Sequence, residues 1–371
     1  MNTEWKKCLL GDLITLQRGY DLPKTKMQNG IYPVIGSNGI IGYHNEYTTE
    51  APSITIGRSG NVGKPFLYNG KSWAHNTSLY IREYKGVNPI FIYYFLFYLN
   101  LGHYAGGSAV PTLNRNHIHA LPVIIPELNI QQKIAGILAS LDDKIELNTK
   151  INENLQKQAR SLYKAWFEDY IPFGGLQPEN WKVGKLKDIL NLKRNAIKPG
   201  EDTKLPYLPI DVIPMNTFAI SDIKPNENAK SSLITFEKDD IIVGAMRVYF
   251  HRVIIAPFAG ITRTTCFVLS PQDKDYLYFG LLFCDQDRTI KYAQTTSKGS
   301  TMPYAVWEGG LRDIDIMIPD KESVHEFNGI VAPMIRTIQS SYEKIKCLRE
   351  IRDTLLPRLM SGELDVSDID L

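Results

Sequence analysis

The 371-residue chain carries 42 Lys and Arg against 40 Asp and Glu, a net charge of +2, and 43% hydrophobic residues, which is ordinary for a globular protein of two or more domains. This near-neutral balance gives little evidence of a nucleic-acid partner unless basic residues cluster locally. Four scattered cysteines without a C-x-x-C spacing exclude a cysteine metal site and a disulfide framework, so a cytoplasmic protein is expected.

The first informative stretch is ITIGRSGNVGKPF, residues 54–66. It resembles a phosphate-binding loop, but Arg58 stands where the pattern needs glycine, and Pro65 follows Lys64 where it needs a hydroxyl. The next segment, PFLYNG, is apolar and then turn-like, which favours a strand over a helix. The sequence therefore predicts a hairpin whose tip presents Arg58, Ser59, Asn61 and Lys64.

The most apolar run, IFIYYFLFYL at 90–99, is about half as long as a membrane span requires. Asn88 and Pro89 before it are typical of a helix N-cap and first turn, so a buried helix and no membrane contact are expected. His117 and His119 in NHIHA stand at strand spacing. No further ligands cluster near them, so they are interpreted as hairpin or loop residues, and no metal site is predicted.

The chain contains an internal repeat. WKKCLLGDLITL near the start recurs as WKVGKLKDILNL, and the hairpin segment and two later segments recur in the same order. Trp5 maps to Trp181 at an offset of 176, Gly57 to Gly244 and Thr77 to Thr264 at 187, Ser108 to Ser300 at 192, and Pro126 to Pro319 at 193. The drift in offset indicates small loop insertions. The hairpin tip thus has a counterpart that carries Arg247, Tyr249 and His251.

Each repeat is followed by a long heptad pattern. Apolar positions alternate at spacings of four and three from 134 to 166 and again, 193 residues on, from 327 to 359, which predicts coiled-coil helices of about 50 Å. Pro333 should kink the second helix or mark its beginning. The seam comprises Ile134, Leu138, Leu141, Ile145, Asn152, Leu155 and Leu162 in the first helix, and Phe327, Val331, Ile338, Ser341, Leu348 and Leu355 in the second.

The two helices are expected to pair with each other, because the second repeat connects them and domain termini often lie close together. If the midpoints of the two helices pair, Asn152 faces Ser341 in the same antiparallel register in which Asn148 faces Ile345. The predicted fold is α+β: two mixed α/β domains in a pseudo-two-fold repeat, separated by two long antiparallel coiled-coil helices. The expected boundaries are 1–126 and 171–320 for the domains, 127–170 and 321–361 for the helices, and 362–371 for an acidic tail.

The chemistry-bearing residues are polar, lie in loops and occur in both repeats. No dinucleotide-binding G-x-G-x-x-G and no nucleophile elbow occurs, so no catalytic residues are predicted. Arg and Asn read base edges, and Lys and Arg neutralise phosphates. The candidate DNA contacts are Arg58, Ser59, Asn61, Lys64, His75, Asn76, Ser108, Asn114 and Arg115 in the first repeat, and Arg247, Tyr249, His251, Arg263, Lys298, Ser300 and Tyr304 in the second.

These motifs, together with QQKI near the start of the first long helix, LYKAWF at its end and LLPRLMSGEL at the close of the second, resemble the specificity subunit of type I restriction–modification systems over essentially the whole chain. The resemblance implies that the globular domains are target-recognition domains, each reading half of a bipartite double-stranded DNA site. It also implies that the helices set the spacer and dock two adenine-methyltransferase subunits. S-adenosylmethionine, ATP and Mg²⁺ would then belong to the methyltransferase and restriction subunits, not to this chain.

Three alternatives remain open at this stage. The same chain could serve a solitary adenine methyltransferase or stand as an orphan, silent subunit. A coiled-coil scaffold that binds no DNA would share the helices, but its affinity for DNA would not fall steeply with salt. An enzyme that uses the glycine-rich hairpin for a nucleotide would bind ATP.

Overall fold

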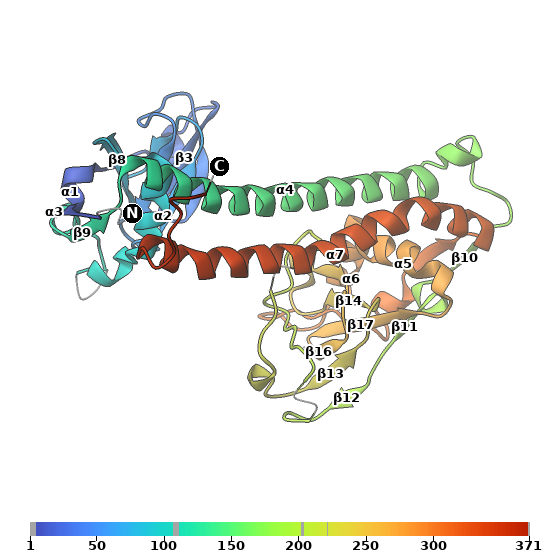
Figure 1. The fold of residues 1–371 in the computed structure, drawn as a ribbon. Helices are drawn as coiled ribbons and strands as arrows, with labels where there is room; N and C mark the ends of the chain where they lie inside the picture. Colours follow the sequence, from blue (N-terminus) through green and yellow to red (C-terminus); the bar gives the residue numbers. More distant parts are fainter. Residues whose placement is uncertain (1–4, 107–110, 202–203, 221, 370–371) are drawn as a thin grey trace. The chain divides into compact units, whose positions relative to one another are not determined.

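The computed structural model describes residues 5–106, 111–201, 204–220 and 222–369, and they form two compact units. Unit 1 combines residues 1–144 with 349–371, and unit 2 comprises residues 145–348. The boundary between the units therefore crosses both long helices, α4 (Leu128–Phe167) and α7 (Lys321–Met360), coloured green and red in Figure 1.

Unit 1 is built on a four-stranded antiparallel sheet in the order β2 (Ile14–Arg18), β8 (Ser78–Tyr84), β5 (Ser53–Gly57) and β6 (Pro65–Tyr68). Strand β5 is buried along its whole length, as its apolar sequence predicts. Helix α2 (Pro89–Tyr98) confirms the buried helix, and the Asn88 side chain caps it by accepting from the Phe91 amide at 2.9 Å.

Smaller elements complete unit 1. Strands β1 and β9 pair with each other, and β4, β3 and β7 form a three-stranded sheet. The bounds are β1 (Lys6–Leu9), α1 (Leu10–Leu13), η1 (Lys24–Lys26), β3 (Tyr32–Gly36), β4 (Gly39–His44), β7 (Trp73–Ala74), η2 (Leu101–Tyr104), α3 (Arg115–His119) and β9 (Pro122–Ile125).

Unit 2 repeats the main sheet in the same order: β11 (Leu190–Leu192), β17 (Cys266–Pro271), β14 (Ile241–Gly244) and β15 (Val253–Ile255). Strands β10 (Lys182–Lys185) and β18 (Asp315–Ile318) pair as β1 and β9 do. The other elements are η3 (Ile171–Phe173), η4 (Leu186–Asp188), β12 (Ala196–Ile197), η5 (Asn226–Asn228), β13 (Leu233–Phe236), η6 (Val248–Phe250), β16 (Gly260–Arg263), η7 (Lys274–Tyr276), α5 (Leu277–Cys284), α6 (Asp287–Thr295) and η8 (Leu311–Asp313).

The strand registers confirm the internal repeat and correct it at one point. Gly57 pairs with Ser78 and Gly244 pairs with Cys266, so Ser78 corresponds to Cys266 at an offset of 188 and Thr77 to Thr265. The predicted match of Thr77 with Thr264 was therefore wrong by one residue. The second hairpin holds the extra residue, because the amide of Gly57 donates to Lys64, seven positions on, whereas that of Gly244 donates to Arg252, eight positions on.

The long helices run antiparallel within each unit. In unit 2, Asn152 Nδ2 donates to Ser341 Oγ at 2.5 Å, and Tyr163 lies against Phe327, so rising numbers in α4 meet falling numbers in α7. In unit 1, Arg352 pairs with Asp142 at 2.7 Å. The predicted pairing of Asn152 with Ser341 is confirmed, and none of the predicted seam residues is exposed. Pro333 lies within α7, so it does not mark the helix beginning.

Two further expectations differ from the structure. Residues 362–369 are not a separate acidic tail: Val366 is buried in the core of unit 1, and Lys133 donates to the Ser367 carbonyl at 2.6 Å. The two histidines at 117 and 119 lie in helix α3, not in a hairpin or loop. His119 Nε2 accepts the Leu16 amide at 2.9 Å, which satisfies a donor at the point where the β2–β8 register is interrupted.

Candidate nucleic-acid interface

Three loop segments of unit 1 converge at the hairpin tip, residues 58–64, called here the first tip. The amides of Arg58 and Ser59 both donate to the Thr77 carbonyl, at 2.8 and 3.2 Å, and the Arg58 carbonyl accepts from Leu113 at 3.0 Å. Ser59 also forms a bridge with Thr112. Backbone hydrogen bonds therefore bring together the predicted residues near 58–61, 75–76 and 114–115, which the sequence places far apart.

Glycine is required in the first tip because the backbone is crowded there. A Cβ atom at Gly57 would lie 1.9 Å from the carbonyl oxygen of Asn61. Gly63 has φ +80°, and a Cβ there would lie 2.1 Å from the amide nitrogen of Gly102 in η2. The glycines that resembled a phosphate loop thus allow a tight turn packed against η2. This short helix also carries His103 and Tyr104, two residues that no sequence motif indicated.

The predicted side chains of unit 1 fall into two groups. Arg58 and Lys64 form no side-chain hydrogen bond or ion pair with any residue that the structure describes, Lys64 and Arg115 are exposed, and Arg58 is half-buried. Others have local partners: Asn76 donates to Asp21, His75 lies 3.1 Å from the Thr77 hydroxyl, and Asn114 caps α3. The first group is free to meet a partner, whereas the second shapes the surface.

Unit 2 builds its tip, residues 245–252, on the same backbone frame, and this is called the second tip. The amides of Ala245 and Met246 donate to the Thr265 carbonyl at 2.8 and 3.2 Å, and the Ala245 carbonyl accepts from Ala305 at 2.8 Å. Met246 and Lys298 each form a bridge with Tyr304. Ala245, Met246 and Tyr304 therefore correspond to Arg58, Ser59 and Thr112 of the first tip.

Arg247 projects from the second tip in an unusual backbone conformation. Its φ of 50° lies in the left-handed region, and its amide donates to the Pro303 carbonyl at 2.7 Å. Its side chain is exposed and forms no hydrogen bond or ion pair within the described part of the chain. The predicted residues Tyr249, Arg263, Lys298, Ser300 and Tyr304 are exposed as well. Ser108, the first-repeat residue that was matched with Ser300, lies outside the described residues.

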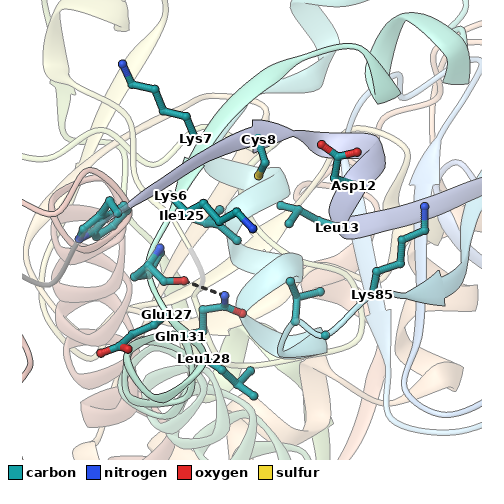
Figure 2. Close-up of a pocket in the computed structure, with 14 residues that line it drawn as sticks. Lys6, Lys7, Cys8, Asp12, Leu13, Lys85, Ile125, Glu127, Leu128 and Gln131 are labelled. Carbon is teal, nitrogen blue, oxygen red and sulfur yellow. Dashed lines mark hydrogen bonds between the residues drawn. The ribbon is translucent and has the colours of Figure 1, made fainter.

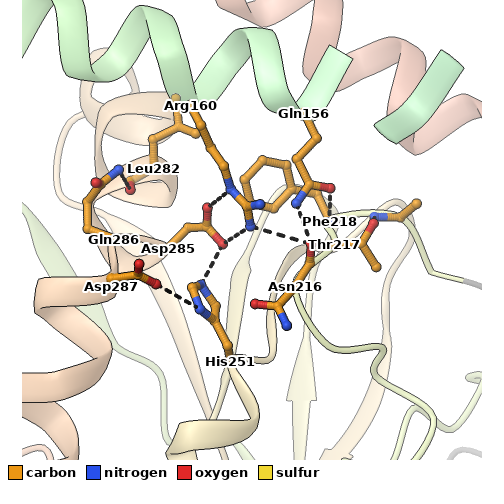
Figure 3. A network of polar contacts seen from close by, with 11 residues as sticks. Gln156, Arg160, Asn216, Thr217, Phe218, His251, Leu282, Asp285, Gln286 and Asp287 are labelled. Carbon is orange, nitrogen blue, oxygen red and sulfur yellow. Dashed lines mark hydrogen bonds and ion pairs between the residues drawn. The ribbon is translucent and has the colours of Figure 1, made fainter. Parts of the chain in front are cut away.

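His251 corrects the prediction. It is 9% exposed, and its Nε2 lies 2.9 Å from Asp285, a carboxylate whose side chain is 1% exposed. Figure 3 shows Arg160 reaching from α4 to the same carboxylate, with bonds of 2.5 and 2.8 Å. A buried imidazole held against a buried carboxylate cannot reach an outside partner, so His251 anchors the base of the second tip and is removed from the contact set.

A second set of bonds ties the same network to α4. Gln156 donates to the Asn216 carbonyl at 2.7 Å and accepts the Phe218 amide at 3.0 Å, and the Asn216 amide donates to the His251 carbonyl at 2.8 Å (Figure 3). The sequence could not indicate this network, because Arg160, Asn216, His251 and Asp285 are distant along the chain. Its consequence is a second tip braced against α4 by charged and amide groups.

A groove of about 1050 Å³ in unit 1 lies between β1, β9 and the start of α4 (Figure 2). Lys6, Lys7 and Lys85 contribute to its lining, and Lys85 donates to the Gly11 carbonyl at 2.7 Å. Gln131, the buried amide in its wall, accepts from Asn88 and donates to Pro126. Because the Gln131 amide is satisfied at both ends, this buried group does not demand a ligand in the groove.

Within the described residues, no group of three or more His, Cys, Asp or Glu side chains could hold a metal ion. None of the described helices has the length and apolarity to cross a membrane. The features that remain are two copies of one domain, each with a cationic loop tip, attached to antiparallel helices, which define a protein with two related binding surfaces.

Comparison with known proteins identifies the class. Residues 2–157 and 178–348 match the type I restriction modification DNA specificity domain, and the chain belongs to this family. The MjaIX specificity subunit of Methanocaldococcus jannaschii is 28% identical over 317 residues, covering 76% of this chain and 71% of the relative. The HindI specificity subunit of Haemophilus influenzae is 25% identical over 332 residues, covering 68% of this chain and 71% of the relative.

A solved structure supports the fold. The crystal structure of a type I restriction–modification system S subunit from M. genitalium matches with a TM-score of 0.68 and 17% sequence identity, covering 99% of this chain and 98% of that chain. At this identity the match establishes the shared fold, including the mixed helix-and-sheet domains and the long helices. The match does not show which residues of this chain contact DNA.

Proposed function

We propose that this chain is the DNA-reading subunit of a type I restriction–modification complex and that each tip reads one half of a bipartite duplex site. The observation that carries the proposal is the shared backbone frame of the two tips, which presents different cationic side chains. The first tip carries the half-buried Arg58 and the exposed Lys64, whereas the second carries the exposed Arg247, with the exposed Lys298 beside it. A common frame with different side chains suits two related but unequal half-sites.

This chain would carry out no catalytic step itself. The helices α4 and α7 would set the spacer and dock two methyltransferase subunits, and restriction–translocase subunits would join the complex in the cytoplasm. S-adenosylmethionine, ATP and Mg²⁺ would be held by those partners, and methylation and cleavage would be activities of the assembly. Family membership supports this division of labour.

The test is co-expression of the chain with a type I methyltransferase subunit in a host that lacks modification, followed by genome-wide mapping of methylated adenines. The expected result is one asymmetric motif of two short half-sites around an unread spacer. Purified complex should bind that motif with an affinity that falls steeply between about 50 and 200 mM salt. Absence of both a motif and salt-sensitive binding would support the scaffold alternative instead.

A further inference from the structure

The second tip borders a cavity whose walls are mainly apolar. The cavity has a volume of about 570 Å³, and its lining includes Ala245, Met246, Phe267, Tyr304 and Trp307. Phe267 and Trp307 pack edge to face with ring centroids 6.0 Å apart. A cavity of this size with aromatic walls and few polar groups is typical of sites that receive an apolar part of a ligand.

The cavity is continuous with the candidate DNA surface. Tyr304 in its wall is 47% exposed, and the neighbouring Met302 is 50% exposed, so large apolar groups face solvent here. The exposed cations Arg247 and Lys298 lie beside them, linked through Pro303 and Tyr304. An Arg194–Glu308 ion pair also lies in the lining. Cations next to exposed apolar groups fit a partner that carries both phosphates and methyl groups.

The first tip presents different chemistry at the equivalent positions. Arg58, Ser59 and Thr112 occupy the places of Ala245, Met246 and Tyr304, as the matching backbone hydrogen bonds and bridges establish. Three polar side chains on one tip thus correspond to three largely apolar ones on the other. The backbone hydrogen bonds at these three positions are shared although the second tip is one residue longer, so the exchange of side chains indicates a difference in what is read.

One polar group in the cavity wall lacks a good partner. The Thr265 hydroxyl is buried without a hydrogen-bond partner among the described residues. This hydroxyl places a polar group beside the apolar walls of the cavity, although its oxygen is itself closed to solvent. Thymine offers this combination in the major groove, where its 5-methyl group stands beside the O4 acceptor.

We propose that this cavity receives the 5-methyl group of a thymine in the half-site read by unit 2, with Tyr304 and Met246 as the specificity-determining side chains. This inference rests on the proposed DNA-reading function and deepens it. The first half-site is then read through polar contacts at Arg58, and the second through an apolar contact at Tyr304.

The test changes the DNA before it changes the protein. Each thymine of the mapped site is replaced singly by deoxyuridine, which lacks only the methyl group, and affinity for the assembled complex is measured. One position in the half-site of unit 2 should lose about fourfold in affinity, the value of one buried methyl group. Deoxyuridine in the spacer should have no effect.

Protein variants then locate the methyl group. The Tyr304→Ala complex should bind the thymine and deoxyuridine duplexes equally, while Tyr304→Phe should keep the discrimination because the ring remains. A thymine preference that persists undiminished in Tyr304→Ala would overturn the placement in this cavity.

The inference and the proposed function fail differently. If deoxyuridine at every thymine of that half-site leaves affinity unchanged, while a transversion in the same half-site abolishes binding, the methyl-reading cavity is wrong but DNA reading stands. If no sequence is bound specifically, the proposed function itself is wrong.

Discussion

Replacing Asp285 by alanine tests the buried network beneath the second tip. Asp285 accepts from Arg160 at 2.5 and 2.8 Å and lies 2.9 Å from His251, with 1% of its side chain exposed. Breaking a fully buried ion pair costs about 3–5 kcal/mol, because the partner charge is left uncompensated. Arg160 is 32% exposed and can regain water, which places the expected loss near the lower limit, about 3 kcal/mol.

Calorimetric unfolding of the full chain at neutral pH measures the loss. For a unit of this size, about 3 kcal/mol corresponds to a fall in Tm of roughly 6–12 °C in the transition of unit 2. Asp287→Ala is the matched control: it faces the same histidine at 3.6 Å, but its side chain is 85% exposed, so a shift within about 2 °C is expected. Equal shifts for Asp285→Ala and Asp287→Ala would refute the reasoning.

Three further changes test other parts of the chain. Asn152→Leu should stabilise unit 2 by about 1–2 kcal/mol in urea unfolding, because the buried Asn152 Oδ1 has no partner and Ser341 Oγ keeps its bond to Ile338; destabilisation would contradict this. Burial lowers the pKa of His119 from its ordinary 6.5, so the folded state resists a proton that the unfolded chain accepts. The stability of unit 1 should therefore fall as pH drops from 7 to 5. The His119→Gln variant, measured in parallel thermal scans, should lose less stability over the same pH range. Deleting one heptad from each of α4 and α7 shortens each by about 10 Å, so the mapped spacer should shorten by about 3 base pairs with both half-sites kept; an unaltered spacer would contradict the role of the helices.

The repeat and the helices could be predicted because their signals are periodic or duplicated. The four-three spacing predicted the pairing of Asn152 with Ser341, which the structure confirms at 2.5 Å. The register error at Thr77 has a specific cause. The pair Thr264–Thr265 resembles the pair Thr77–Ser78, so an alignment that ignored the one-residue insertion in the second tip still matched similar residues. Side-chain similarity alone could not locate that insertion, whereas strand pairing does.

The burial of His251 could not be predicted, because its partner Asp285 follows the end of α5, far from it in sequence, and is itself held by Arg160 of α4. The tail was misread for a related reason: its acidic residues dominate the composition, but Val366 and Leu364 pack into unit 1. In both cases local sequence indicated solvent exposure, and long-range packing determined the outcome. Arg58 and Arg247 were found correctly as loop residues, while their contacts with bases stay a prediction.

The central claim is that the two tips read separate halves of one DNA site. Arg58→Ala and Arg247→Ala complexes, each expressed in an unmodified host, should be compared by genome-wide adenine methylation. Loss of one Arg–base contact is worth about 1–3 kcal/mol of discrimination. Arg58→Ala should relax the motif in one half-site only, and Arg247→Ala should relax it in the other only. Motifs unchanged in both variants, or relaxed in the same half-site, would contradict it.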